Sequence, residues 1–382
     1  MAAIRIVAAL DAIDSSTWNA LAGDDNPFVS HAFLSALEAT GCIRPEFGWQ
    51  PSHLILDEDG KPVAAMPLYV KHNSHGEFVF DWAWADAWER AGGAYYPKLL
   101  CAVPYSPVTG PRLLAGSGPH AGERRRALTQ ALAALTRSNG LSSAHVDFIA
   151  GAELDAFGDE WLERSDWQFH WRNDQGWRDM ADFLSALTHR RRKAIRQERA
   201  QVERAGIACE WRNGGSLSAD EWRAMHALYT HTFDEKGNTP TLSARFFRTL
   251  GERFPAHSHV AFARRGEHIV AGALFLSSRS TLYGRYWGAF ESVPALHFEL
   301  CYYQGIEHCL RSGLTAFEPG AQGAHKLARG FLPVATHSRH WIADPGFRAA
   351  VRHALRREAS ALERRHRDLM AHSPFARHGT TA

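Results

Sequence analysis

A histidine and a carboxylate stand two residues apart in the run from His75 to Trp84. This run begins His75-Gly76-Glu77, and its first part alternates polar with apolar residues. In a strand, alternate side chains point to the same face, so His75 and Glu77 would project together. An imidazole beside a carboxylate suits general acid–base catalysis. The same pattern also fits an edge strand with two surface residues.

Two segments rich in proline, tyrosine and cationic residues follow. Tyr96 and Lys98 lie in the first, and the second ends in Arg112. Proline restricts the backbone φ angle, so these segments are expected to be preorganised loops and not core strands. We predict that Tyr96, Lys98 and Arg112 line a substrate site.

An arginine flanked by aromatic residues marks the next candidate strand, 282–288. Alternation places Tyr283, Arg285 and Trp287 on one face, while Tyr286 points the other way. Arginine between aromatic rings can bind an anion and stack at the same time. All four residues are therefore predicted to bind substrate.

The helix expected from His297 to Arg311 adds two more candidates, His297 and Glu299. We take Glu77 and Glu299 as candidate catalytic bases, with His75 and His297 as proton relays. A carboxylate in the first turn of a helix is also favoured by the helix dipole alone, so Glu299 has a purely structural alternative.

A glycine-containing loop after the strand expected at 315–318 completes the set. Glycines at 320 and 323 permit a tight turn, which Gln322, His325 and Lys326 would line. A loop of this composition can receive an anion. It has neither the GxxxxGK[ST] nor the GxGxxG order, which excludes an ordinary P-loop or dinucleotide fingerprint.

Four consecutive cations, Arg190 to Lys193, lie on a helix expected from Met180 to Ala205. Such a helix either binds phosphates, as in tRNA, a nucleotide or a lipid headgroup, or is a solvated face from which Arg199 points outward. We therefore keep tRNA as a candidate partner.

Composition limits the classes of function. With 43 Lys+Arg against 41 Asp+Glu and 45% hydrophobic residues, the chain resembles an average soluble domain, and no DNA partner is expected. The five cysteines form no CxxC, and no histidine–carboxylate spacing matches a zinc motif, so no metal is expected. No apolar run approaches the ~20 residues of a membrane span. We expect a cytoplasmic protein of unspecified oligomeric state.

These candidates must be positioned by elements that occur in the same order twice. Helices, an antiparallel hairpin or meander, a further helix and a last strand are expected within 1–155 and again within 156–382. That order is the one of acyl-CoA N-acyltransferase (GNAT) folds. The prediction is an α/β protein of two tandem GNAT-like units, each with a mixed, mostly antiparallel sheet flanked by helices.

Several of these motifs resemble those of the FemAB-like predicted N-acyltransferases, described as peptidoglycan biosynthesis or recognition proteins. The resemblance covers about residues 15 to 370, and it rests on six motifs: 75–82, 95–99, 110–114, 283–288, 296–304 and 320–326. Ala324 departs from the pattern, because the family usually has a glutamate at that position.

The resemblance implies transfer of an acyl or aminoacyl group to an amine, with peptidoglycan precursors as acceptors. It implies no permanently bound cofactor, because acyl-CoA or aminoacyl-tRNA would be the donor substrate. One site between the halves would bring Glu77 or Tyr96 within about 10 Å of Arg285 or Glu299. The alternative is a catalytically silent module that binds a cell-wall precursor or peptide on the same fold.

Overall fold

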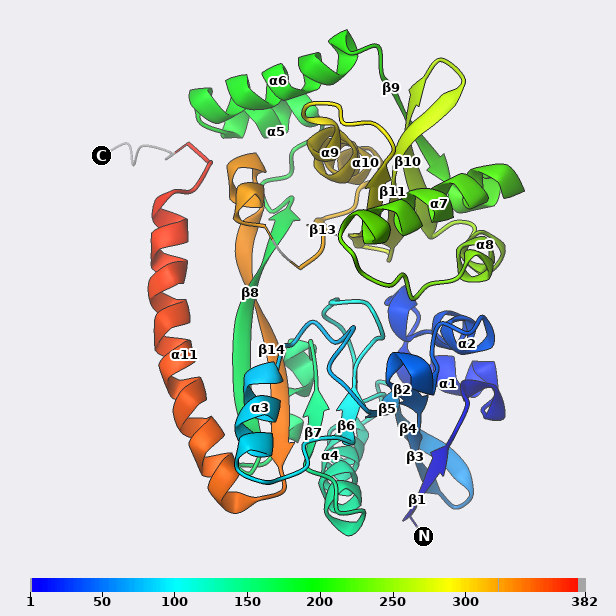
Figure 1. The fold of residues 1–382 in the computed structure, drawn as a ribbon, viewed down its shortest axis with the longest axis vertical. Helices are drawn as coiled ribbons and strands as arrows, with labels where there is room; N and C mark the ends of the chain where they lie inside the picture. Colours follow the sequence, from blue (N-terminus) through cyan, green and yellow to red (C-terminus); the bar gives the residue numbers. More distant parts are fainter. Residues whose placement is uncertain (1, 322, 377–382) are drawn as a thin grey trace. The chain divides into compact units, whose positions relative to one another are not determined.

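The computed structural model describes residues 2–321 and 323–376, which form two compact units (Figure 1). Unit 1 comprises residues 1–166 and 335–363, and unit 2 comprises 167–334 and 364–382. From the sequence we expected a single domain boundary, after residue 155. In the structure the chain crosses between the units in two strands and one long helix: β8 (Leu162–Arg172), β14 (Leu332–Ile342) and α11 (Pro345–Ala371).

Unit 1 contains the following further elements: β1 (Ala2–Val7), α1 (Ser15–Ala22), α2 (His31–Ala39), β2 (Trp49–Pro51), β3 (His53–Glu58), β4 (Lys61–Met66), β5 (Leu68–Lys71), α3 (Trp82–Arg90), β6 (Lys98–Cys101), α4 (Ala121–Ser138) and β7 (Ser143–Val146). Strands β1, β3 and β4 form a small antiparallel sheet. The main sheet has the order β2-β5-β6-β7-β14, and its one parallel pair, β6 with β7, is joined by α4.

Unit 2 contains the following further elements: α5 (Met180–Ala186), α6 (His189–Arg204), β9 (Ala208–Asn213), α7 (Ala219–Glu235), α8 (Ala244–Arg253), β10 (Ser258–Arg265), β11 (His268–Ser277), β12 (Thr281–Ala289), α9 (Leu296–Phe298), a π-helical turn (Glu299–Tyr303), α10 (Gln304–Ser312) and β13 (Ala316–Glu318). The strand order β13-β12-β11-β10-β9 again includes one parallel pair, β12 with β13, joined by a helix. The repeated element order predicted from the sequence is therefore present.

Local sequence signals explain several helix boundaries. Ser218 and Glu221 form the capping box expected at the start of α7, each side chain meeting the other's backbone N–H. The helix predicted as continuous from Met180 to Ala205 is instead two helices, because residues 187 and 188 leave the helical conformation: Leu187 and Thr188 have ψ values of 156° and 149°.

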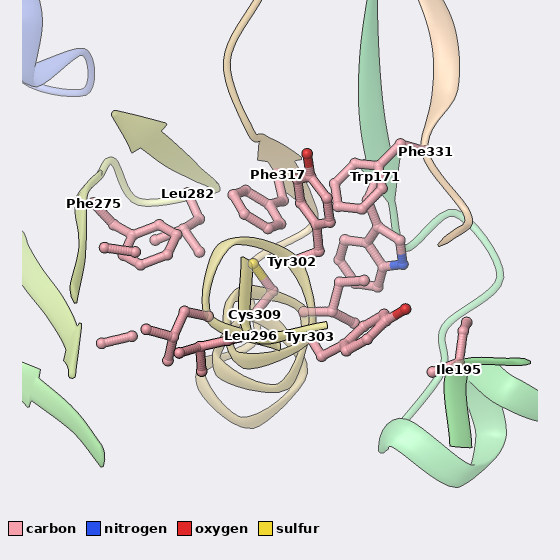
Figure 2. Packing of buried hydrophobic residues seen from close by; sticks show 14 of the residues in the cluster. Trp171, Ile195, Phe275, Leu282, Leu296, Tyr302, Tyr303, Cys309, Phe317 and Phe331 are labelled. Carbon is pink, nitrogen blue, oxygen red and sulfur yellow. The ribbon is translucent and has the colours of Figure 1, made fainter. Parts of the chain in front are cut away.

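Each unit has its own hydrophobic core. In unit 2 the rings of Trp171, Phe317 and Phe331 gather around Tyr302, which the π-helical turn supplies (Figure 2). Phe331 lies 5.3 Å from Tyr302 and 5.4 Å from Phe317 between ring centroids. This core therefore holds the π-helical turn against β13. Within the described residues, no helix combines the length and the apolar character needed to cross a membrane.

Candidate functional site

The loop after β5 does not form the strand expected over 75–84. Gly76 and Phe78 adopt left-handed φ angles of 80° and 66°, which a strand cannot accommodate, and residues from Trp82 onward form α3. His75 and Glu77 consequently do not share a face: His75 is exposed, whereas Glu77 is 3% exposed. The expectation that they project together was wrong.

Glu77 belongs to a buried group of charged and polar side chains in unit 1, which we call the N-terminal cluster: Lys71, Ser74, Glu77, Asp81 and Lys98. Lys98 Nζ donates to Ser74 Oγ at 2.9 Å, to Glu77 Oε2 at 2.7 Å and to Asp81 Oδ2 at 2.5 Å. Lys98 is completely buried. It therefore acts as an internal counter-ion to two carboxylates that the loop supplies.

Burial and neighbouring charges set the proton affinities of this cluster. Burial raises the pKa of Glu77 to about 7, and burial lowers the pKa of Lys71 to about 7. Burial also opposes the charge on Asp81, but its contact with Lys98 holds the pKa of that carboxyl below its ordinary value. The pKa values of Glu77 and Lys71 therefore both lie near neutrality.

Tyr96 and Arg112 occupy different settings in unit 1. The half-buried Tyr96 hydroxyl lies 2.8 Å from Ser74 Oγ. Tyr96 therefore adjoins the N-terminal cluster, which contains the predicted residues Glu77 and Lys98. Arg112 is fully buried and donates to the carbonyls of residues 108, 111 and 147. Its guanidinium thus holds the loop that precedes it.

Tyr95 and His145, which sequence reasoning did not select, extend the N-terminal cluster inward. Tyr95 donates to Asp81 Oδ2 at 2.6 Å, and His145 Nδ1 lies 2.7 Å from Nδ1 of His340. Asp81 itself stood inside the first motif. The contact between His145 and His340 could not be read from the sequence, because these residues are 195 positions apart.

In unit 2, four side chains from separate segments meet in what we call the C-terminal cluster: His297, Tyr302, His325 and Lys326. The His297 ring lies 5.4 Å from Tyr302 and 6.2 Å from His325, and Tyr302 OH is 2.8 Å from His325 Nε2. Trp287 borders the group, 5.2 Å from His297. Residues predicted from three motifs therefore converge within this unit.

Lys326 is the most perturbed cation of the C-terminal cluster. It is 2% exposed, and its Nζ donates to the Gly320 carbonyl at 2.6 Å. Burial lowers the pKa of Lys326 to about 8, and burial together with nearby His325 lowers the pKa of His297 to about 4. The cluster thus combines a neutral imidazole with an amine that is partly neutral near physiological pH.

Glu299 is engaged in a salt bridge that sequence reasoning did not foresee. Arg199 donates to both of its oxygens at 3.1 Å and also to Glu307 at 2.6 Å. Arg199 therefore points inward, contrary to the solvated-face interpretation of this helix. Spacing could have indicated this, because Arg199 lies between the buried Ile195 and Val202 on α6.

A second inward pair joins α6 to the glycine-containing loop. Arg329 donates to both oxygens of Glu198, at 2.6 and 3.2 Å, and its guanidinium carbon lies 3.4 Å from the centre of the Phe298 ring. Tyr303 also donates to Glu198. Glu198 and Arg199, which are adjacent on α6, thus hold the π-helical turn and the loop around Lys326 in place.

The strand β12 contains a β-bulge at Arg285. Leu274 of β11 pairs with Tyr286 and Phe275 pairs with Gly284, so Arg285 is an extra residue and strict alternation does not continue through it. Tyr286 packs against Tyr229 of α7, whereas Trp287 faces His297, so these two rings point to opposite sides as expected. Tyr283 is buried. Gln322 lies outside the described residues.

The described part of the chain contains no group of three histidine, cysteine, aspartate or glutamate side chains arranged to hold a metal ion.

A model of the FemAB-like family, described as peptidoglycan biosynthesis/recognition, matches residues 9–377. The chain belongs to the FemAB-like family. No curated protein matches its sequence.

Solved structures resemble this FemAB-like chain at low sequence identity. FemX is 10% identical, with a TM-score of 0.51, covering 89% of this chain and 98% of its own. The C-terminal domain of a putative lysylphosphatidylglycerol synthetase from Agrobacterium fabrum is 10% identical, with a TM-score of 0.54, covering 89% and 95%. A tandem GNAT protein from the clavulanic acid biosynthesis pathway is 13% identical, with a TM-score of 0.46, covering 90% and 99%. The likeness to FemX and the repeated sheet order confirm the predicted fold of two GNAT-like units.

Proposed function

We propose that this protein is an N-acyltransferase that moves an acyl or aminoacyl group from an activated carrier to an amine of a peptidoglycan precursor. The family description, peptidoglycan biosynthesis/recognition, supports this acceptor class. The name of the Agrobacterium fabrum relative, a lysylphosphatidylglycerol synthetase, gives a parallel in which an amino acid is joined to an acceptor. The reaction would take place in the cytoplasm, where both candidate carriers are made.

The observation on which the proposal rests is the C-terminal cluster beside the parallel strand pair. Strand β12 pairs with β13 from Thr281 to Tyr283 and then runs on to Ala289, while β13 ends at Glu318. Residues 284–289 of β12 therefore continue past the end of β13, where the loop to Lys326 begins. An extended carrier chain can lie along the projecting part of β12, with its reactive carbonyl near the cluster.

The cluster supplies what acyl transfer needs. The acceptor amine must lose a proton before its nitrogen attacks the carbonyl carbon, and the exposed imidazole of His325 can accept that proton. The oxygen of the tetrahedral intermediate gains negative charge, which Lys326 Nζ can stabilise by a hydrogen bond. When the intermediate collapses, the bond between the carbonyl carbon and the carrier breaks, and the new amide remains.

The carrier is either acyl-CoA or aminoacyl-tRNA, and in both cases it is a substrate. The exposed cations of α6 that are not drawn inward, such as Arg190 and Lys193, provide the phosphate contacts that a tRNA needs. We favour the tRNA for that reason. A peptide amine is the acceptor.

The test is a transfer assay with purified protein, a panel of acyl-CoAs and charged tRNAs, and a muropeptide acceptor, read by mass spectrometry of the acceptor. We expect a mass increase of one acyl or aminoacyl group with one carrier class. Lys326→Met should lower the rate at least a hundredfold, as loss of one oxyanion donor typically does. The matched control is Lys61→Met, an exposed cation of β4 in unit 1, to which no role in binding or catalysis is assigned. Equal rates for both variants would remove Lys326 from the reaction.

A catalytically silent precursor-binding module is the second candidate, because Ala324 stands where the family pattern has a glutamate. Native mass spectrometry separates the two. A bound carrier supports the enzyme, whereas binding of muropeptide alone supports the module.

A further inference from the structure

Three aromatic residues, two in the loop before α3 and one at the first position of α3, face solvent. Phe78, Phe80 and Trp82 are 37%, 42% and 51% exposed, and all three lie within five residues of chain. We call them the aromatic platform. Grouped exposed aromatic side chains usually mark a contact surface, because single rings are common on protein surfaces but clusters are not.

Buried charges hold this loop in place. Glu77 and Asp81 are chain neighbours of the platform residues. Their carboxylates point inward and accept from Lys98 Nζ at 2.7 and 2.5 Å. Arg164 also donates to the Phe80 carbonyl at 2.8 Å and is itself fixed by Glu358 at 3.0 Å. The rings are therefore displayed on a backbone that is already ordered, which lowers the entropic cost of binding a ligand.

The rings form a surface with a polar border. The Phe80 and Trp82 centroids are 4.9 Å apart and the planes are inclined by 31°, so the two rings partly stack on each other and brace one another, leaving an outer ring face for a ligand. The exposed His75 ring lies 6.3 Å from Trp82 and can donate or accept a hydrogen bond at the edge.

We propose that the aromatic platform binds the pyranose ring of a saccharide. One face of such a ring presents C–H groups of partial positive charge, which pack on the negative face of an aromatic ring, while its hydroxyls bind polar side chains at the border. The amino sugar of a peptidoglycan precursor is the expected ligand, and this identity alone rests on the proposed function.

The charges beside the platform favour a neutral saccharide over an anionic bilayer. A membrane-binding aromatic surface is normally accompanied by several lysines or arginines. On α3 the exposed neighbours are Asp86, Glu89 and Arg90, and Arg90 is paired with Asp86. The exposed charges of α3 have no positive excess, so this helix is not expected to draw the platform to acidic lipids.

Binding can be measured without any acyl donor. The probes are the disaccharide N-acetylglucosaminyl-N-acetylmuramic acid carrying its peptide, and the same peptide alone, titrated by calorimetry into the full chain. We expect the glycopeptide to bind more tightly than the peptide. Trp82→Ala and Phe80→Ala should each weaken glycopeptide binding about two- to tenfold, because one aromatic contact is worth ~0.5–1.5 kcal/mol and 1.4 kcal/mol is tenfold. Ile4→Ala is the control, since Ile4 is 42% exposed in the same unit.

The outcomes separate this inference from the proposed function. Equal affinity for peptide and glycopeptide, or unchanged affinity in both platform variants, overturns the saccharide site. Co-sedimentation with phosphatidylglycerol vesicles that depends on Trp82, with no saccharide binding, would assign the platform to a membrane instead. If the protein transfers the acyl group to the free peptide but binds no sugar, the proposed function stands and the saccharide site is wrong. If it binds the sugar but transfers nothing, the saccharide site stands and the proposed function is wrong.

Discussion

Glu299 shows how one contact changes the meaning of a candidate residue. By sequence it is a possible base, yet in the structure Arg199 and Gln304 donate to its oxygens. We predict that Glu299→Gln lowers the free energy of unfolding by roughly 1–3 kcal/mol. This is less than the 3–5 kcal/mol of a fully buried pair, because Arg199 is partly exposed and keeps Glu307.

A double-mutant cycle of Glu299→Gln and Arg199→Gln, followed by chemical denaturation, measures this coupling. Strictly additive losses would show that the pair contributes nothing to stability. Unchanged stability of Glu299→Gln together with lost transfer would instead restore Glu299 as the base.

Glu77 makes the stability of unit 1 depend on pH. Its pKa rises to about 7 on folding, from an ordinary value of 4.5, because the carboxyl is buried. The folded state therefore binds the proton more tightly, and its stability falls as pH rises from about 4.5 to about 7. Relative to Glu77→Gln, wild type should lose up to about 3 kcal/mol across this window, at 1.36 kcal/mol per pKa unit.

Denaturation at a series of pH values between 4 and 8 tests this. A difference between wild type and Glu77→Gln that does not change with pH would show that Glu77 stays ionised throughout, held by Lys98.

At the scale of the element, α6 has two functions on two sides. On its inward side Glu198 and Arg199 form ion pairs, and on its outer side cations of the first turns are exposed to solvent. We predict that reversing Arg190, Arg191 and Arg192 to glutamate weakens tRNA binding and flattens its salt dependence, because each phosphate contact contributes about −0.9 to the slope of log K against log salt for duplex nucleic acid.

Filter binding of charged tRNA at increasing salt gives both quantities. The control carries the same three charge reversals at Arg356, Arg357 and Arg365, exposed positions on α11. If the two triple variants lose affinity equally, the effect is one of net charge, and tRNA should be dropped as a partner.

At the scale of the whole molecule, each unit is built from two separate stretches of chain. Residues 335–363 complete unit 1, where Trp341, Ile342 and Val351 are at most 3% exposed. We predict that a fragment of residues 1–155 does not fold, because the loss of these side chains exposes apolar surface worth ~1.5–3 kcal/mol each.

Circular dichroism on heating is the measurement. The comparison is residues 1–166 joined by a flexible linker to 335–363, which should melt cooperatively. Cooperative melting of the 1–155 fragment by itself would support the single boundary expected from the sequence.

Sequence patterns alone determined most of the element types, the repeated order and the family. Helical and strand periodicities depend on near neighbours, so α7 with its capping box and the hairpin of β10 and β11 could be predicted from local residues. The sequence motifs also supplied His297, His325 and Lys326 as candidates, and the structure places these three residues near one another in unit 2.

The tertiary structure decided which of the chosen residues are accessible and which are paired. Left-handed φ angles at Gly76 and Phe78 separate His75 from Glu77, and the bulge at Arg285 interrupts the alternation of β12. The partners of Glu77 and Glu299 lie 21 and 100 positions away in the chain. Burial and ion pairing are properties of groups brought together by folding, so spacing in the sequence could suggest a carboxylate but could not show whether a lysine or arginine already occupies it.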